Sequence, residues 1–452
     1  NILKILSTGK RHDIDPDDSK RTIEKTVVTD KLILAIYADA QTRLREPRHL
    51  KQLISSLDSI NWFDAQKDGL GDLYEGLLEK NANETKSGAG QYFTPRVLID
   101  TIVRCVKPKA GELIQDPAAG TGGFLISAHK YIKENTNDLY DLSGKNGLPT
   151  REEQIKKYYV GIELVPNTRR LALMNCLLNG IEGEKDGAIH LGNALGKSGT
   201  DLESADVILA NPPFGTSKGG DASITRKDLD FSTNNKQLAF LQHIYRNLKA
   251  GGRAAVVLPD NVLFEEGNYG TEIRRDLMNK CNLHTILRLP TGIFYAAGVK
   301  TNVLFFTKGS EIDRYQEENC TTKTWVYDLR TNMPSFGKRT PFGEKHLESF
   351  EAVYNIPLSE RKEGDWTFVA DELQNNTDAS RWKCFSRKYI KDAKGDSLNI
   401  SWLKGNDSID VEDLGAPVEL AEQAMIELKG ALADIKKLVN SLSLESKVEV
   451  KE

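Results

Sequence analysis

The sequence predicts a doubly wound α/β fold, in which helices cover both faces of a mostly parallel β-sheet. From residue 89 to residue 345, short β-rich runs alternate with helical stretches, the pattern of repeated strand–helix–strand units. Residues 1–88 instead carry apolar side chains at helical spacing, and a Gly- and Ser-containing linker at 86–90 separates the two regions. We therefore expect a helical N-terminal region followed by an α/β domain.

The individual elements are predicted from the spacing of apolar residues. Strands are expected at 112–116, 158–163, 188–191, 206–210, 253–258, 283–289 and 302–307. Helices are expected at 27–44, 50–57, 70–78, 95–106, 123–132, 167–178, 235–248 and 270–280. Residues 346–415 are polar with scattered Trp and Phe, so we expect an extension there without assigning its architecture. A last helical pattern covers 416–445.

Length and composition limit the class of protein. A chain of 452 residues with 39% hydrophobic residues is typical of a globular protein with two or three domains. No apolar run approaches the ~18–20 residues that span a bilayer. The five cysteines lie far apart, so we expect reduced thiols and no metal site. The chain begins at Asn1 rather than Met, and we expect the N-terminal region to be truncated.

The net charge of −4 also bears on possible partners. A protein that grips duplex DNA alone usually presents a basic face, because neutralising phosphates dominates the affinity. A local basic groove remains compatible with this charge. We nevertheless expect that this chain is not by itself the main DNA-gripping surface.

A glycine-rich turn follows the strand predicted at 112–116. It reads DPAAGTGGF from Asp116 to Phe124 and opens the next predicted helix. Ligands of open α/β sheets bind at the carboxyl ends of strands, where glycines let the backbone approach a ligand closely. On its own, such a turn is compatible with a ligand site and with a purely structural role.

A second acidic side chain, Glu163, ends the next predicted strand. An acid at this place can accept hydrogen bonds from ribose hydroxyls. The ~20-residue spacing of a dinucleotide fingerprint is exceeded here, and a polar insertion at 135–154 accounts for the excess. A solvated carboxylate at the end of a strand is the alternative interpretation.

The sharpest motif directly follows the strand predicted at 206–210 and consists of Asn211, Pro212, Pro213 and Phe214. Two consecutive prolines fix φ and remove two N–H donors, which leaves rigid carbonyls. The Asn211 side-chain oxygen and the Pro212 carbonyl can then both accept hydrogen bonds from one NH₂ group. Phe214 can stack on the heterocycle that carries this amine. The motif therefore suits the exocyclic amine of a base turned out of its helix.

The two motifs together resemble the cofactor and catalytic motifs of nucleic-acid amino-methyltransferases, in the order of the gamma class of adenine-N6 enzymes. Longer segments resemble type I restriction–modification modification subunits: ANETKSGAGQYFTPR (82–96), IELVPNTRRLALMNCLLNGIEG (162–183), NPPFG (211–215), GGRAAVVLPDNVLF (251–264), RLPTGIFYAAGVKTNVLFFTKG (288–309) and WVYDLRTNMPSFGKRTPF (325–342). The likeness covers nearly the whole chain, although members of the family usually carry a longer helical N-terminal region.

The resemblance implies an S-adenosylmethionine-dependent methyltransferase that modifies the N6 amine of adenine in DNA. It implies that the cofactor contacts Gln91, Tyr92, Phe93, Thr94, Pro95 and Arg96 at its methionine end, Asp116, Thr121, Gly122 and Gly123 along the turn, Glu163 at the ribose and Asn193 at the adenine ring. For Asn193, a turn-forming role is equally open. Thr94 and Pro95 also suit the N-cap and first residue of a helix. No general base is needed, and we expect structural roles for His129, His190, His243 and His284.

The resemblance also implies partners and a location. They are double-stranded DNA, a specificity subunit that chooses the site and is flanked by two modification subunits, and a restriction and translocation subunit, in the cytoplasm of a prokaryotic cell. Two other functions stay open. One is methylation of protein glutamine or of RNA, whose amines also suit an NPP-aromatic motif, and the other is a catalytically inactive scaffold subunit.

Two further segments carry expectations. The polar loop 215–233 is predicted to close over the extruded base, with a surface loop of no such role as the alternative. The C-terminal helix carries a heptad stripe formed by Ala421, Met425, Leu428, Leu432, Ile435, Val439 and Leu442. This narrow stripe predicts a coiled-coil contact with the specificity subunit, with packing on the chain's own core as the alternative.

Overall fold

The computed structural model describes residues 2–14, 22–38, 46–59, 94–214, 224–267, 269–294, 299–337, 340–363 and 381–403. The helices expected at 70–78 and 416–445 and most of the expected closing loop lie outside these residues. No helix among the described residues is long and apolar enough to cross a membrane.

The N-terminal region contains a β-hairpin as well as helices. Its helices are α1 (Ile2–Thr8), α2 (Lys31–Tyr37) and α3 (Pro47–Asp58), and the last two overlap the helical patterns in the sequence. Between α1 and α2, β1 (Lys10–Ile14) pairs antiparallel with β2 (Thr22–Thr26), a hairpin that was not predicted for this helical region. These strands are charged, with Lys10 Nζ 2.6 Å from Glu24 Oε1, and no apolar alternation marks them.

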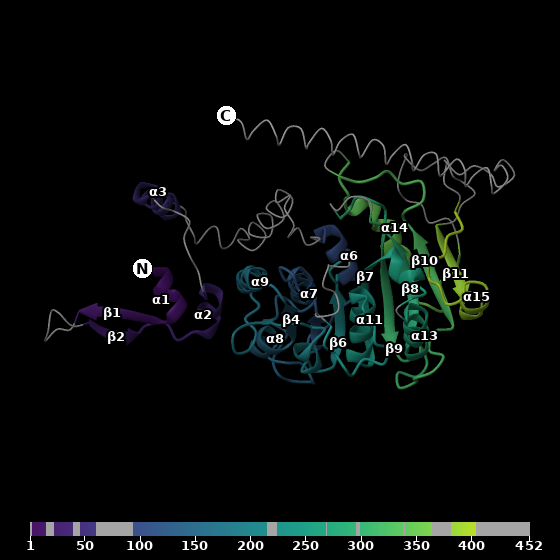
Figure 1. Cartoon of the computed structure of the whole chain (residues 1–452), viewed down its shortest axis with the longest axis horizontal. Coiled ribbons are helices and arrows are strands. Elements are labelled where there is room, and N and C mark those ends of the chain that lie inside the picture. Colours follow the sequence, from purple (N-terminus) through teal and green to yellow (C-terminus); the bar gives the residue numbers. More distant parts are fainter. Residues whose placement is uncertain are drawn as a thin grey trace, which may run out of the picture. The chain divides into compact units, whose positions relative to one another are not determined.

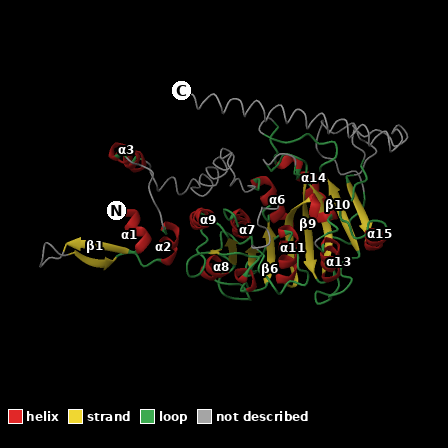
Figure 2. Cartoon of the chain, in the orientation of Figure 1, coloured by secondary structure: helices red, strands yellow, loops and turns green. Residues whose placement is uncertain are grey.

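The rest of the described chain is built on one nine-stranded sheet (Figures 1 and 2). In spatial order its strands are β11 (Trp382–Ser386), β10 (Lys323–Asp328), β8 (Cys281–Arg288), β9 (Thr301–Lys308), β7 (Leu248–Pro259), β6 (Ala205–Ala210), β3 (Ile114–Asp116), β4 (Tyr159–Glu163) and β5 (Ile189–Leu191). Neighbours are parallel, except that β9 runs antiparallel to β7 and β8 and β11 runs antiparallel to β10. The doubly wound prediction is confirmed, with an antiparallel strand inside the sheet.

Alternate residues of the central strands point into two separate hydrophobic cores. Val207 and Leu209 of β6 belong to one core, whereas Ile208 and Ala210 belong to the other. This alternation is the period of two that every β-strand imposes, and it shows that both faces of the sheet are buried. A sheet of this kind needs apolar residues at consecutive positions, which explains why its strands read as continuous apolar runs.

Helices supply the outer layer of each core. The first core takes buried side chains from α6 (Arg96–Val106), α7 (Gly123–Glu134), α9 (Pro166–Leu178) and α14 (Glu348–Tyr354). The second takes them from α11 (Lys236–Asn247), α12 (Asp260–Phe264), α13 (Gly270–Lys280) and α15 (Arg387–Asp392). The remaining short helices are α8 (Arg151–Lys157), α10 (Lys197–Thr200) and the 3₁₀ turn η2 (Glu344–His346).

The seven strands predicted for the α/β domain, and its five predicted helices, all occur with shifts of a few residues at their ends. β10 and β11 were not predicted. β11 extends the same sheet well past residue 345, so part of the expected extension belongs to the α/β architecture. Trp325 of β10 stacks on Trp382 of β11 with ring centroids 5.0 Å apart, a long-range contact that local periodicity does not reveal.

A buried ion pair fixes the end of β10. Arg288 Nη1 donates to Asp328 Oδ2 at 2.7 Å, and both side chains are buried. Asp328 also accepts hydrogen bonds from the backbone N–H of Arg330 and of Thr331. Burial lowers the pKa of Arg288, and the charge of Asp328 opposes this shift. Removing one partner would therefore leave an uncompensated buried charge.

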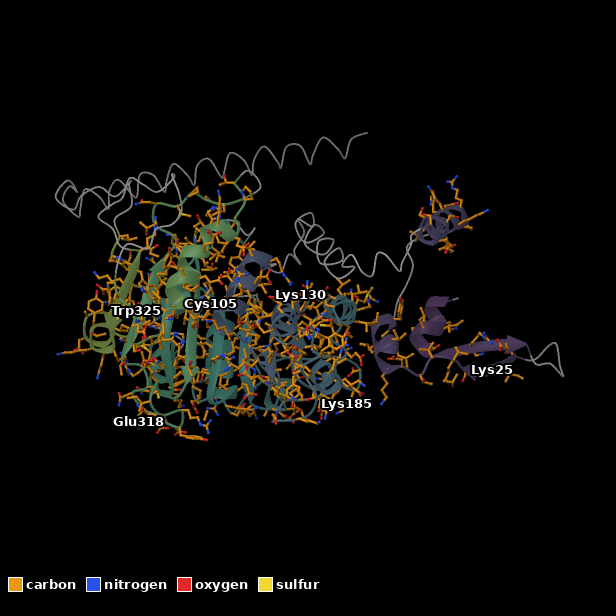
Figure 3. The ribbon with its side chains drawn as sticks, turned by 180° about the vertical axis from the view of Figure 1, so that it is seen from behind. Lys25, Cys105, Lys130, Lys185, Glu318 and Trp325 are labelled. Carbon is orange, nitrogen blue, oxygen red and sulfur yellow. The ribbon has the colours of Figure 1, made fainter. Side chains whose placement is uncertain are left out.

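We predict that Asp328→Ala lowers the free energy of unfolding by about 3–5 kcal/mol, because it leaves Arg288 buried without its carboxylate. Urea denaturation of the two proteins at neutral pH measures this difference. Glu318→Ala, in the exposed loop before β10 (Figure 3), is the control and should change stability by less than about 0.5 kcal/mol. A loss below about 1 kcal/mol for Asp328→Ala would show that the pair contributes little.

Candidate active site

The glycine-rich turn joins the end of β3 to the start of α7. Gly120 has φ +54° and Gly122 has φ +83°, a region that L side chains rarely adopt. A Cβ at Gly122 would also lie 3.2 Å from Cys176 Sγ, whereas a Cβ at Gly120 would meet nothing within 4 Å. The glycines therefore form the turn, and the space beside Gly120 is open to a ligand.

Two acidic side chains, Glu163 and Asp116, accept hydrogen bonds from the backbone of this turn. Glu163, at the end of β4, accepts hydrogen bonds from Gly120 N at 3.0 Å and from Val165 N at 2.8 Å. Burial raises the pKa of Glu163, and these backbone donors oppose the shift. Asp116 accepts from Ala118 N at 3.0 Å, and burial raises its pKa to about 8, with the charge of Glu163 adding to the effect. The turn is thus held by two buried acidic residues whose pKa values are raised.

The loop after β5 lies along the same edge of the sheet. Asn193 Oδ1 accepts a hydrogen bond from Leu195 N at 2.9 Å, which closes a local turn. Leu195 O in turn accepts from Thr225 N at 2.9 Å, so the loop is tied to the segment that precedes α11. The turn-forming role left open for Asn193 is confirmed, and a contact of Asn193 with a cofactor stays a prediction.

The Asn-Pro-Pro-Phe motif follows the end of β6. Asn211 Nδ2 donates to Thr94 Oγ1 at 2.7 Å, and Gln237 Nε2 donates to the Pro213 carbonyl at 2.9 Å. Phe214 is half-buried and packs edge-to-face on Phe294, with ring centroids 5.6 Å apart and planes at 79°. The carbonyl of the second proline in the motif, Pro213, is therefore already hydrogen-bonded to Gln237. The aromatic ring that ends the motif is held by another aromatic side chain.

The fold brings the glycine turn and this motif together. β3 pairs in parallel with β6, with Ile114 opposite Val207 and Gln115 opposite Ile208, so both strands end at one edge. β4 lies on the other side of β3, and the strand order therefore reverses at β3. Such a switch point is where open α/β sheets bind ligands.

Comparison with known proteins identifies the family. The family model described as N-6 DNA Methylase matches residues 65–383. The chain belongs to this family. The type I restriction enzyme StySPI methylase subunit of Salmonella potsdam is 57% identical over 432 residues, which cover 91% of this chain and 80% of that protein. The EcoKI methylase subunit of Escherichia coli K12 is 55% identical over 440 residues, which cover 93% and 82%. Within the family, the chain is a type I methylase subunit.

Solved structures agree with this assignment of the methylase subunit. The crystal structure of the EcoKI M protein has a TM-score of 0.65 and 51% identity, and the match covers 91% of this chain and 80% of that chain. A structure concerned with complex assembly and conformational transition of the type I R-M system contains a chain with a TM-score of 0.64 and 26% identity, covering 91% and 78%.

The structure alters part of the expectation for the segment before α6 of the methylase subunit. Gln91, Tyr92 and Phe93 lie outside the described residues. The N-cap of α6 is Pro95 and no side chain caps it, so Thr94 is not the N-cap and its hydroxyl faces Asn211 instead. Arg96 Nε lies 3.1 Å from Asp100 Oδ1, one helical turn further on. These three cofactor assignments in 94–96 stay predictions.

Sequence patterns did not mark several residues that support the site. Gln237 and Phe294 contact the motif directly, as described above. Asn175 of α9 donates from Nδ2 to the Thr121 carbonyl at 3.0 Å and holds the glycine turn. Phe294 lies within a segment that resembles the family, which was the available signal for it. Asn175 likewise lies within a family-like segment, 162–183, whereas Gln237 lies outside those segments and carries no local signature.

Three of the family-like segments meet in one polar cluster at the same edge. Arg330 Nη1 and Nη2 lie 2.7 and 2.9 Å from the Asp260 carboxylate, and Asn302 Nδ2 donates to Asp260 Oδ1 at 2.7 Å. Arg330 Nε also donates to the Leu289 carbonyl at 2.9 Å. This cluster ties β7, β8, β9 and β10 together at the start of the loop that carries Phe294.

Burial favours the neutral form of three histidines. Burial lowers the pKa of His129 to about 4 and those of His243 and His284 to about 3. His129 Nδ1 lies 3.1 Å from the Tyr159 hydroxyl, and Arg226 Nη1 lies 2.9 Å from His243 Nδ1. These contacts agree with structural roles. No group of three or more potential metal ligands occurs among the described residues.

The carboxyl of Asp116 generates a prediction about pH. Its pKa of about 8 in the folded protein exceeds its ordinary value of 3.8, so folding takes up a proton between these values. The stabilisation that it contributes is present below about pH 4 and is lost as the pH rises toward 8. Asp116→Asn removes this loss and keeps the oxygen that accepts from Ala118 N.

We therefore expect the stability of wild type relative to Asp116→Asn to decline steadily between pH 5 and pH 8. Urea denaturation midpoints of both proteins at each pH provide the comparison, with one pKa unit equal to about 1.4 kcal/mol. Parallel pH profiles for the two proteins would mean that Asp116 is ionised in the folded state.

Proposed function

We propose that this type I methylase subunit transfers a methyl group from S-adenosylmethionine to the N6 amine of an adenine turned out of duplex DNA. The observation that carries the proposal is the position of the Asn211–Phe214 motif beside the glycine turn, at the strand-order reversal around β3. One motif offers acceptors for an amine and the other offers a backbone approach to a cofactor. The family match supports this division of roles.

The residues around the glycine turn fit S-adenosylmethionine. Open space lies beside Gly120, and each Glu163 oxygen that accepts one backbone N–H keeps a lone pair for a ribose hydroxyl. When bound, the cofactor supplies an electrophilic methyl group on a sulfonium. The residues that would hold it are Gln91, Tyr92, Phe93, Thr94, Pro95, Arg96, Asp116, Thr121, Gly122, Gly123, Glu163 and Asn193.

The motif would hold and activate the adenine. The Asn211 side-chain oxygen and the Pro212 carbonyl accept hydrogen bonds from the two N–H groups of the amine. The Pro213 carbonyl is not assigned this role, because it already accepts a hydrogen bond from Gln237. These acceptors gain strength as the amine loses its conjugation and becomes positive, which stabilises the transition state more than the ground state. Phe214 stacks on the base, an interaction worth ~1–3 kcal/mol, while Phe294 holds the Phe214 ring edge-on.

We propose that the subunit acts within a larger assembly on chromosomal DNA in the prokaryotic cytoplasm. A net charge of −4 suits a subunit that relies on a partner to grip DNA. The specificity subunit would choose the site, with two modification subunits beside it, and a restriction subunit would join the complex. The relationship to a chain from a type I R-M assembly supports these partners. The heptad stripe at 421–442, which lies outside the described residues, remains our proposed seam for the specificity subunit.

The decisive experiment for the whole function is methylation in cells. Plasmid DNA is sequenced for N6-methyladenine after expression of this subunit with and without its specificity subunit. We expect methylated adenines at one defined sequence, and only when both subunits are present. Labelled methyl groups that appear in protein or RNA instead of DNA would overturn the proposal, and a complex that methylates nothing would indicate a scaffold role.

The assignment of the base site predicts the effect of two substitutions. Asn211→Ala should lower the single-turnover methylation rate about 100-fold or more, because it removes an acceptor that acts in the transition state. Phe214→Ala should lower it about tenfold or more through loss of stacking. Both should bind S-adenosylmethionine within about threefold of wild type, since neither lies in the glycine turn.

Tyr315→Ala is a suitable control, because Tyr315 is 66% exposed and lies in the loop between β9 and β10. Its methylation rate should match that of wild type. Wild-type turnover by the Asn211→Ala complex would refute the catalytic assignment.

The assignment of Glu163 to the ribose predicts a separate effect on the cofactor. Glu163→Ala should weaken S-adenosylmethionine binding at least about tenfold, because it removes a charged acceptor and the bonds that hold Gly120 and Val165. Calorimetric titration of the cofactor measures the effect, after urea denaturation has shown that the variant is folded. Glu134→Ala, at the exposed end of α7, is the matched control. Unchanged affinity in folded Glu163→Ala would place the ribose elsewhere.

A further inference from the structure

Two polar side chains hold the Asn-Pro-Pro run from outside the motif. Thr94 precedes α6, and its hydroxyl oxygen accepts from Asn211 Nδ2 at 2.7 Å. Gln237 lies in the first turn of α11, is buried, and donates to the Pro213 carbonyl at 2.9 Å. The two residues lie 117 and 24 positions from their partners in the chain and belong to different elements.

We propose that Thr94 and Gln237 are positioning residues, which fix the two acceptors that receive the adenine amine. The proposal rests on the proposed function, because it concerns the orientation of groups that act on that amine. Neither residue needs to touch the base. Each acts through a motif residue, one on the side-chain acceptor and the other on the backbone acceptor.

The Thr94 contact affects the Asn211 amide in two ways. An asparagine amide presents an oxygen acceptor on one side and N–H donors on the other, and only the oxygen can receive the adenine amine. The bond from Nδ2 to Thr94 fixes the orientation of this amide, so that its oxygen points away from Thr94. Donation from Nδ2 also polarises the amide and makes its oxygen a stronger acceptor, as in other hydrogen-bonded chains.

The structure indicates that Thr94 is committed to this contact. A threonine directly before a proline at the start of a helix commonly caps that helix with its hydroxyl. Here no side chain caps α6, and the Pro95 carbonyl accepts from Leu98 N and Ile99 N at 3.0 and 3.1 Å. The hydroxyl is therefore turned away from its own helix and toward the motif.

The Gln237 contact selects between neighbouring carbonyls. Prolines fix φ but leave ψ free, so the peptide planes of the motif are set only when a carbonyl is held. Gln237 holds that of Pro213, and its own backbone N–H is bonded to Asn235 Oδ1 at 3.0 Å, which fixes the start of α11. Because the Pro213 peptide is held by Gln237, the direction of the neighbouring Pro212 carbonyl is restricted, and we assign this carbonyl to the amine.

The test uses the complex with its specificity subunit and an oligonucleotide duplex containing the site. Thr94→Val and Gln237→Met should each lower the single-turnover methylation rate about three- to tenfold, the range that one neutral hydrogen bond contributes. The affinity for DNA should stay within twofold of wild type in both variants, and the affinity for S-adenosylmethionine should do so in Gln237→Met. For Thr94→Val, which lies in the proposed cofactor site, the rate is compared at saturating cofactor. Thr94→Ser, which keeps the hydroxyl, should restore most of the rate.

Two further measurements separate positioning from a merely structural role. Gln237→Glu cannot donate when ionised, so its rate should rise relative to wild type as the pH falls and the new carboxyl takes a proton. Thr101→Val removes a buried hydroxyl from α6, the helix that follows Thr94. This hydroxyl accepts from Arg104 Nη2 at 3.1 Å, and its loss should leave the rate unchanged. Urea denaturation should show that all these variants are folded.

The outcomes distinguish this inference from the proposed function. If Asn211→Ala is inactive while Thr94→Val and Gln237→Met keep the wild-type rate, the positioning roles are overturned and the base site stands. A loss of cofactor affinity in Thr94→Val without a loss of rate at saturating cofactor would assign the hydroxyl to the cofactor instead. Wild-type methylation by Asn211→Ala would overturn both.

Discussion

The parallel pairing of β3 with β6 is the constraint on which the site depends. It places the ends of the two strands at one edge of the sheet, so the glycine turn after Asp116 and the motif that starts at Asn211 must be neighbours. A slip of one residue in this register would move alternate side chains of β6 from one hydrophobic core to the other. Because both cores are filled, packing over the whole sheet fixes the relative position of two chemically distinct motifs. The geometry of the candidate site is thus a consequence of core packing.

The second half of the sheet supports the Asn211–Phe214 motif rather than the glycine turn. Because β9 is antiparallel to its neighbours, it begins at the edge where β7 and β8 end. This places Asn302 near Asp260, and Arg330 bonds to both Asp260 and the Leu289 carbonyl. These contacts secure the loop that presents Phe294 to Phe214. Such partly buried charge clusters contribute little net stability, because desolvation opposes the attraction, but they define one arrangement of several loops. The segments 288–309 and 325–342, which resemble type I modification subunits specifically, therefore supply Phe294 and most of the polar contacts that support it.

Local signals in the sequence were enough for seven strands of the large sheet and for the two motifs, since apolar runs, glycines and prolines impose backbone geometry over a few residues. They failed where the deciding contact is distant or polar. Thr94 has the sequence of a helix cap, yet its hydroxyl bonds to Asn211, far along the chain. Gln237 and Asn175 contribute single hydrogen bonds that no spacing predicts. The hairpin of β1 and β2 is paired through charges, and β10 and β11 meet through two tryptophans within a polar stretch.

The place of β9 has a consequence for synthesis on the ribosome. β8 pairs only with β9 and β10 among the described strands, and both follow it in the chain. The strands β3 to β7 are made first, and β7 keeps an open edge until Lys308 has been made. Unpaired edges are templates for association with other chains. A translation product that stops between β8 and β9 would hold the strands that carry both motifs beside an exposed hydrophobic strand, and so would be a substrate for chaperones or proteases.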